Sequence, residues 1–322
     1  MNTSTARAVA GYGTAFAMTP YLIVKIGWTV AGLRGDAPGD GPWDRLDWVL
    51  LNALTVGMAG AAILLGLLLA RPWGLRAPGW VTLLPAWIGM GFLVPMLPVI
   101  PLLLLLSPAS GGATPAAGLP AWEGALLTAS FAGFGLGVAV AFPLYARERW
   151  PQAFGSGLAS PPSTGPRRTA AQLATVAGVT IGLPQLYWAL GGTVGLDPAN
   201  LGRRDAQWHL FVGNTGLWAL IAAWGVWTVT HRRAGPGSRR RLLVTWVASG
   251  FLFAWGTWKA VLTYAVVEAY PPPEPPWVLA LENHFGALTG AVILLVLTLV
   301  IADRRQAPAA ARRSSATVVD AG

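Results

Sequence analysis

The side chains with the clearest chemical potential are ionisable groups that stand within, or at the ends of, long apolar runs. They are Lys25, Lys259, Glu123 and Glu282. Ionisable groups are costly in lipid and commonly mark functional sites, so these four are the first candidates. A carboxylic acid shielded from water can keep its proton and donate it, and we expect Glu123 or Glu282 to act in this way. Lys259 could pair with Glu282 or Glu123 inside a helix bundle; alternatively, both lysines could extend outward to reach water.

Aromatic residues surround one of these lysines. Trp255 and Trp258 are one helical turn apart and flank Lys259. Because the faces of aromatic rings attract cations, a tryptophan-lined cavity that also holds an acid has what the proton-initiated cyclisation of an isoprenoid requires. The alternative is structural, since tryptophans also serve in packing and in the aromatic belts at membrane interfaces.

Further polar residues are candidates for binding a substrate. His209 and His284 lie at or just inside predicted helix ends, Asn214 follows His209 in the same apolar run, and Lys25 completes this group. The two histidines lie in different predicted helices, which makes a shared metal a weak hypothesis, and we expect no metal and no other cofactor. The chain has no cysteine, which excludes disulfides and thiolate metal sites.

Four acidic residues also have a purely structural interpretation. Each stands at the start of a predicted helix: Asp47, Glu123, Asp205 and Glu282. An acid at this position complements the helix dipole and stabilises the helix by about 0.3–1 kcal/mol without any active site. The sequence leaves both roles open for Glu123 and Glu282.

The elements that must position these residues are predicted to be transmembrane helices. Hydrophobic residues make up 54% of the 322 positions and charged residues only 11%, where a soluble domain has about 25%. A hydrocarbon core of roughly 30 Å needs about 20 apolar residues per helical crossing. The apolar runs do not alternate with polar residues as membrane strands would. We therefore predict an all-α polytopic bundle with eight spans, at about 9–33, 47–70, 80–106, 124–146, 170–194, 206–230, 242–267 and 283–302.

The distribution of charge predicts how the bundle is oriented. The net charge is +9, and every second segment between the predicted spans is basic. The positive-inside rule then places both termini in the cytoplasm, in a multi-pass protein of the inner (plasma) membrane. The basic segments are expected to contact anionic lipid. Because no basic face is interleaved with stacking aromatics on a soluble element, we expect no nucleic-acid partner.

The chain also contains signs of an internal duplication. Residues 87–93 (WIGMGFL) recur as residues 246–252 (WVASGFL), and residues 121–123 (AWE) match residues 280–282 (ALE) at the same offset. Weaker matches occur in the same order along the chain. Copies with an even number of spans share one orientation, so we expect a parallel repeat.

This duplication predicts the domain organisation. The expected parts are a first four-helix repeat (1–149), a cytoplasmic linker (150–168), a second four-helix repeat (169–303) and a disordered cytoplasmic tail (304–322). Pro95, Pro98 and Pro101 should break or bend the third span. The oligomeric state is not predicted, because close-packing glycines serve contacts within and between chains alike.

Two resemblances follow from these residues. In its richness in Ala, Gly, Arg and Trp, the chain resembles uncharacterised polytopic membrane proteins of high-GC actinobacteria. Its outer-end acids within aromatic-rich helices give it a looser similarity to integral membrane terpene cyclases. No diagnostic motif of that family is found, so none of its site residues is transferred to this chain.

Three functions remain compatible with the sequence. The first is a membrane-embedded enzyme that acts by acid catalysis on a hydrophobic small molecule, for example an isoprenoid, in an outward-facing cavity. The second is a transporter or permease with a site between the two repeats. The third is a non-catalytic scaffold or regulator. The inner half of the predicted bundle has almost no charge, which favours a cavity open to the outside and hence the first function.

Overall fold

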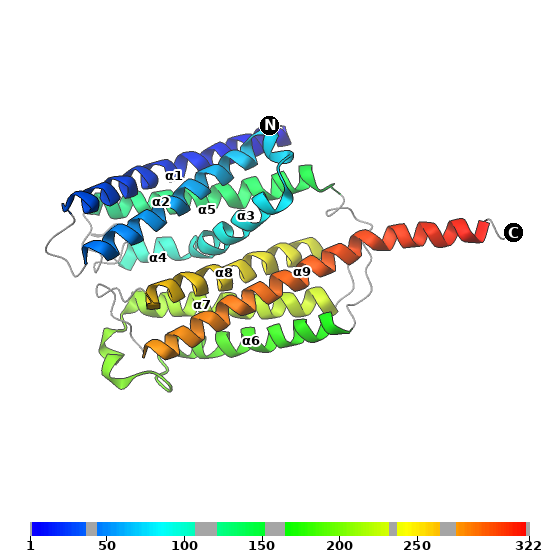
Figure 1. Ribbon diagram of the computed structural model, residues 1–322. Coiled ribbons are helices and arrows are strands. Elements are labelled where there is room, and N and C mark those ends of the chain that lie inside the picture. The colour runs from blue at the N-terminus through cyan, green and yellow to red at the C-terminus, as the bar shows by residue number, and fades with distance from the viewer. Residues whose placement is uncertain are drawn as a thin grey trace.

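The computed structural model of the chain describes residues 2–36, 44–106, 121–151, 165–231, 237–264 and 275–319. The predicted linker 150–168 lies mostly outside these residues. Within the described part the structure is all α-helical, with short 3-10 turns at Pro72–Leu75, Val94–Met96 and Pro198–Arg203 (Figure 1). The helices are α1 (Thr3–Arg34), α2 (Arg45–Ala70), α3 (Gly79–Leu93), α4 (Val99–Leu106), α5 (Ala121–Arg149), α6 (Pro166–Ala189), α7 (Ala206–His231), α8 (Ser238–Tyr264) and α9 (Pro276–Val319).

Six helical segments are long and apolar enough to cross a membrane. They are Thr3–Arg34, Arg45–Ala70, Gly79–Met96, Trp122–Arg149, Ala206–His231 and Trp277–Ala302. Large apolar side chains such as Phe16, Trp80 and Leu295 are exposed along them, where lipid would cover them. The chain is a polytopic α-helical membrane protein. The other two expected spans coincide with α6 and α8, which are long helices but less apolar, because they carry arginines in their first turns and further polar residues along their length.

The helices form two bundles that lie side by side (Figure 1). In the first bundle α1 packs against both α2 and α5, and α3 packs against α5. In the second bundle α6 packs against α7 and α9, and α8 packs against α7 and α9. Each bundle has its own apolar core, centred on residues such as Met90 and Phe134 in the first and Phe251 and Leu297 in the second.

The two bundles meet mainly where α3 crosses α8. The crossing is close because glycines face each other: a Cβ added to Gly91 would lie 2.2 Å from the carbonyl carbon of Gly250. The Trp87 indole donates a hydrogen bond of 3.0 Å to Ser249 Oγ. Its ring lies 4.7 Å from that of Phe253. Any side chain larger than hydrogen at Gly91 would therefore push the bundles apart.

The third predicted span is interrupted, as its prolines predict. Helix α3 ends at Leu93, a 3-10 turn covers Val94–Met96, and α4 begins at Val99. A helix end leaves carbonyl groups without intrahelical partners, which is costly in lipid. One of them, the carbonyl of Phe92, accepts a hydrogen bond of 3.1 Å from the indole of Trp255 in the other bundle.

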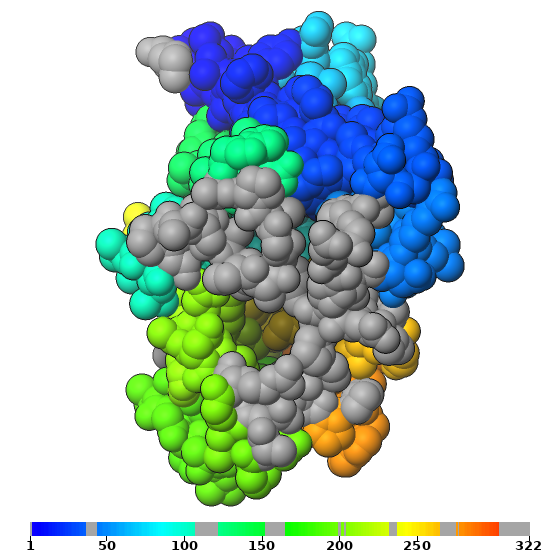
Figure 2. Space-filling view, turned by 90° about the vertical axis from the view of Figure 1, so that its left-hand side faces the viewer, coloured from blue at the N-terminus to red at the C-terminus, as the bar shows by residue number. Residues whose placement is uncertain are grey.

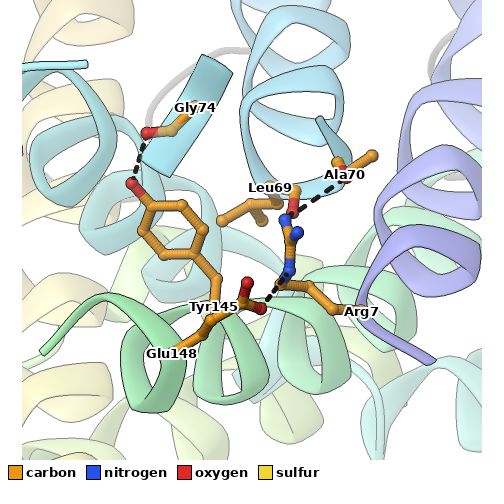
Figure 3. A network of polar contacts seen from close by, with 6 residues as sticks. All are labelled: Arg7, Leu69, Ala70, Gly74, Tyr145 and Glu148. Atoms are coloured by element: carbon orange, nitrogen blue, oxygen red, sulfur yellow. Dashed lines mark hydrogen bonds and ion pairs between the residues drawn. The ribbon is translucent and has the colours of Figure 1, made fainter. Parts of the chain in front are cut away.

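A polar network joins the helices of the first bundle at the end where α2 and α5 terminate (Figure 3). Arg7 is buried, pairs with Glu148 at 2.8 Å and donates to the last carbonyls of α2, at Leu69 and Ala70. Tyr145 donates a hydrogen bond of 2.8 Å to the carbonyl of Gly74. Because these contacts satisfy the C-terminal carbonyls of α2 and hold the turn before α3, they fix the connection between the two helices.

Candidate functional site

Acidic residues gather near one end of the molecule, which is called the acidic end below, and four of them belong to the first two turns of a helix or directly precede it. The acidic end is the one at which α2, α5, α7 and α9 begin, and these four acids are Asp47, Glu123, Asp205 and Glu282. Figure 2 views the molecule from this end.

The second bundle contains a small cavity close to its acidic end. Its volume is about 30 Å³, enough for roughly two water molecules. All four helices of the bundle contribute to its wall. The lining residues are Ile181, Thr215, Phe251, Leu252, Trp255, Gly256, Lys259, Glu282, Asn283 and Gly286. The cavity therefore combines an apolar wall with one acid, one base and two neutral polar groups.

Glu282 is the acid of this cavity. It lies six residues after the start of α9, which is about 9 Å along the helix axis. Gln185, buried in α6, donates a hydrogen bond from Nε2 to Glu282 Oε1. This bond fixes the direction of the carboxyl group and leaves its second oxygen without a hydrogen bond from any described residue.

Lys259 is the basic residue of the same cavity, but it does not form an ion pair with Glu282. It is half-buried in the second-last turn of α8. Among the described residues its ammonium group has no hydrogen bond and no ion pair within 4.0 Å. Lys259 and Glu282 therefore share a cavity without forming the direct pair that the sequence left open.

Aromatic rings form one wall of the cavity. Trp255 and Phe251 line it, with ring centroids 6.4 Å apart. The hydrogen bond from Trp255 to Phe92 holds the indole in place. Trp258, although next to Lys259 in sequence, is half-buried and does not line the cavity.

Neutral polar groups complete the surroundings. Asn283 lines the cavity, and its amide donates a bond of 3.3 Å to the Thr263 hydroxyl. Thr215 lines the cavity from α7. The preceding residue, Asn214, is 7% exposed, and its amide nitrogen has no hydrogen-bond partner in the described structure. An unpaired buried amide is uncommon and calls for an explanation.

The first bundle has its own polar cluster at the acidic end, and there the groups satisfy one another. Lys25 donates a hydrogen bond of 2.9 Å to Asn52 Oδ1, and its ammonium lies 4.2 Å from the centre of the Trp28 ring. Glu123, 8% exposed, accepts a hydrogen bond from the Trp28 side chain and is attracted electrostatically by Lys25. The Asn52 amide in turn donates to the Trp48 carbonyl at 2.8 Å. The cluster ties α1, α2 and α5 together.

The two histidines lie apart from both clusters. His284 is exposed and its Nδ1 lies 2.6 Å from the Ala280 carbonyl of its own helix. His209 packs edge-on against Trp208, and its Nδ1 has no partner in the described structure. No group of three or more histidines and acids is placed to hold a metal ion in the described part of the chain.

Asp205 has the structural role that the sequence also allowed. Its Oδ1 accepts a hydrogen bond of 2.8 Å from the backbone amide of Trp208, which caps the start of α7. Asp205 is exposed, whereas Glu123 is buried. The four acids therefore do not form a uniform class.

Comparison of the chain with protein-family models, with curated proteins and with solved structures finds no match. What the site can do must therefore be inferred from its own geometry.

The structure adds site residues that the sequence did not single out. Three are neutral partners of charged groups, Gln185, Asn52 and Trp28, and the fourth, Asn283, lines the cavity and bonds to Thr263. Gln185 directly follows Pro184 in the interior of an apolar helix. A carboxamide in such a position needs a polar partner in lipid, and that signal could have identified it.

Proposed function

We propose that the chain is a membrane-embedded enzyme that acts on a hydrophobic substrate from the acidic end, with the Glu282 carboxyl group as the acid. The observation that carries the proposal is that Glu282, Lys259 and Trp255 line one cavity. A proton donor, a cation and an aromatic wall in a largely apolar site suit acid catalysis on a molecule that reaches the site from lipid.

The aromatic wall favours an isoprenoid as the narrower substrate class, in line with the similarity to membrane terpene cyclases. Glu282 would donate its proton to one carbon of a double bond, and the other carbon would become cationic. The faces of Trp255 and Phe251 would stabilise that cation. Attack by a second double bond forms the new ring bond, and return of a proton to the Glu282 carboxylate closes the cycle.

The proposed orientation places the acidic end outside the cell and both termini in the cytoplasm, in the plasma membrane. Its support is the charge distribution: exposed arginines such as Arg71, Arg147 and Arg240 lie at the opposite end of the bundles. In this arrangement α6 and α8 also cross the membrane, which gives eight spans.

The proposed duplication is supported by matching contacts in the two bundles. The packing of α1 against α2 and α5 corresponds to that of α6 against α7 and α9. Gly91 and Gly250 hold the same place in the repeated sequence and contact each other at the crossing of α3 and α8. Contact between equivalent residues is expected next to a twofold axis.

A transporter is the second candidate, because each bundle carries a lysine and a glutamate near its acidic end. Uptake of a solute into proteoliposomes that depends on Lys25 as well as on Lys259 would favour it. A scaffold would place all four acids in water, and the burial of Glu123 argues against that arrangement.

The enzyme proposal is tested by replacing the acid. Glu282→Gln should abolish a lipid product that cells make only when they express the wild-type chain, as measured by mass spectrometry of lipid extracts. Asp205→Asn is the matched control, since asparagine caps a helix as well as aspartate does. An unchanged lipid profile with Glu282→Gln at normal protein levels would contradict the proposal.

A further inference from the structure

The two polar clusters at the acidic end differ in how far their members satisfy one another. In the first bundle Lys25 is held by Asn52 and lies against the ring of Trp28. Glu123 has Trp28 as a hydrogen-bond partner and is attracted electrostatically by Lys25. Every charged group of this cluster therefore has a partner, and no additional molecule is needed to complete it.

The second bundle uses the same residue types but leaves them incomplete. Lys259 has no hydrogen bond or ion pair with any described residue. The acid there is bonded by a neutral amide, Gln185, in place of a cation. Asn214, which precedes the cavity-lining Thr215, has an unpaired amide nitrogen at 7% exposure. The groups left over are an ammonium and an amide N–H, and both are hydrogen-bond donors.

Unpaired donors of this kind are costly in a membrane. A half-buried ammonium without an anion loses hydration without gaining an ion pair, and a buried amide N–H without an acceptor carries a similar penalty. A ligand that brings an oxyanion into the cavity would give Lys259 the acceptor that it lacks, because oxygens accept hydrogen bonds from ammonium groups.

We propose that Lys259 binds the oxyanion head of a hydrophobic ligand, a carboxylate or a phosphate, in the cavity of the second bundle. The inference rests on the proposed function and names the polar end of its substrate. A cavity of about 30 Å³ has room for the oxygens of such a head group. The cavity wall also includes the apolar residues Ile181 and Leu252, against which the first carbons of the ligand's chain would lie.

The proposed reaction uses Glu282 as a neutral acid, which is compatible with an oxyanion in the same cavity. An ionised carboxylate in the same cavity would repel the oxyanion, whereas a neutral acid would not. The neutral form is also the one that supplies the proton in the proposed reaction. Lys259 then positions the substrate by its head group while Glu282 acts on it, which separates binding from acid catalysis.

The test is direct binding to the full-length protein in lipid nanodiscs, with radiolabelled oleate as the probe. Oleyl alcohol has the same chain without the charge, and inorganic phosphate is an oxyanion without a chain. We expect wild type and Lys259→Arg to bind oleate, and Lys259→Met to bind it about tenfold more weakly or worse, the size expected for a lost charge-assisted hydrogen bond. Competition by phosphate would show that a free oxyanion suffices, and its absence that the attached chain is required; either result supports the site.

Two results would overturn the proposal. One is equal binding of oleate by wild type and Lys259→Met; the other is binding of oleyl alcohol as tight as that of oleate. Thermal unfolding of each variant shows whether it is folded, and Lys259→Met should be, because Lys259 has no partner to lose in the described structure. If Lys259→Met loses oleate binding while Glu282→Gln leaves the lipid profile unchanged, the oxyanion site is retained and the enzyme proposal is rejected.

Discussion

Gln185 donates a hydrogen bond from α6 to the Glu282 carboxyl group on α9, and so joins two helices at the site where the proposed acid acts. Both side chains lie well inside the helix ends, and Gln185 is only 6% exposed. The bond has a structural part, since it pairs two polar groups in lipid, and a chemical part, since it orients the acid.

Replacement of this donor should therefore affect both stability and product formation. Gln185→Leu is expected to lower the free energy of unfolding by about 1 kcal/mol, the usual size for an interhelical hydrogen bond in a membrane protein. It should also reduce the wild-type-dependent lipid product. Unfolding in mixed micelles and mass spectrometry measure the two effects. Leu183→Ala, at an exposed position of the same helix, is the control and should leave the product unchanged.

Loss of the charge should affect the stability of the protein differently at the two lysines. Lys25→Met removes the partner of Asn52 and the cation beside the buried Glu123, so the free energy of unfolding should fall by about 1–3 kcal/mol. Lys259→Met breaks no contact with a described residue and should change it by less than about 0.5 kcal/mol, or raise it. Equal destabilisation by both substitutions would contradict the distinction between a completed and an open cluster.

The crossing of α3 and α8 should depend on Gly91. In Gly91→Ala the new methyl group would meet the backbone of Gly250 at 2.2 Å, so the bundles must separate. We expect a loss of at least about 2 kcal/mol in the free energy of unfolding. Gly57→Ala in α2 is a matched control, because nothing lies within 4 Å of the added carbon, and this variant should be as stable as wild type or more so.

The network around Arg7 should stabilise the first bundle. Arg7→Met leaves the carbonyls of Leu69 and Ala70 without their donor, and we expect a loss of about 1–3 kcal/mol. Glu148→Gln should cost less than about 1 kcal/mol, because the Glu148 side chain is 39% exposed and water can replace its partner. If the two substitutions cost the same in thermal unfolding, the ion pair and not the capping of α2 is the main contribution.

Much of the fold follows from the sequence because membrane helices need long apolar runs, and such runs are visible without a structure. The break after Leu93 was also predictable, since Pro95 and Pro98 cannot donate backbone hydrogen bonds to a continuous helix. The less apolar α6 and α8 show the limit of this signal, because their arginines and polar residues lower the hydropathy of helices that pack alongside the others.

The candidate site was predictable only in part. Glu282, Lys259 and Trp255 were identified individually, and the structure places them around one cavity. The pairing of Lys25 with Asn52 was not foreseen, because which helix faces which depends on packing between segments that are distant in sequence. Gln185 was not predicted, because it carries no charge and its partner Glu282 lies on a helix that is distant in sequence.

The most direct test of the proposed acid is the transfer of a hydron from the protein to the lipid product. Membrane vesicles with the wild-type chain are incubated in deuterium oxide, and their lipids are analysed by mass spectrometry. The account predicts a lipid species with one added deuterium that forms with wild type and Asp205→Asn but is absent with Glu282→Gln. Formation of the same labelled species by Glu282→Gln, or its absence from wild type, would contradict the assignment of Glu282 as the acid.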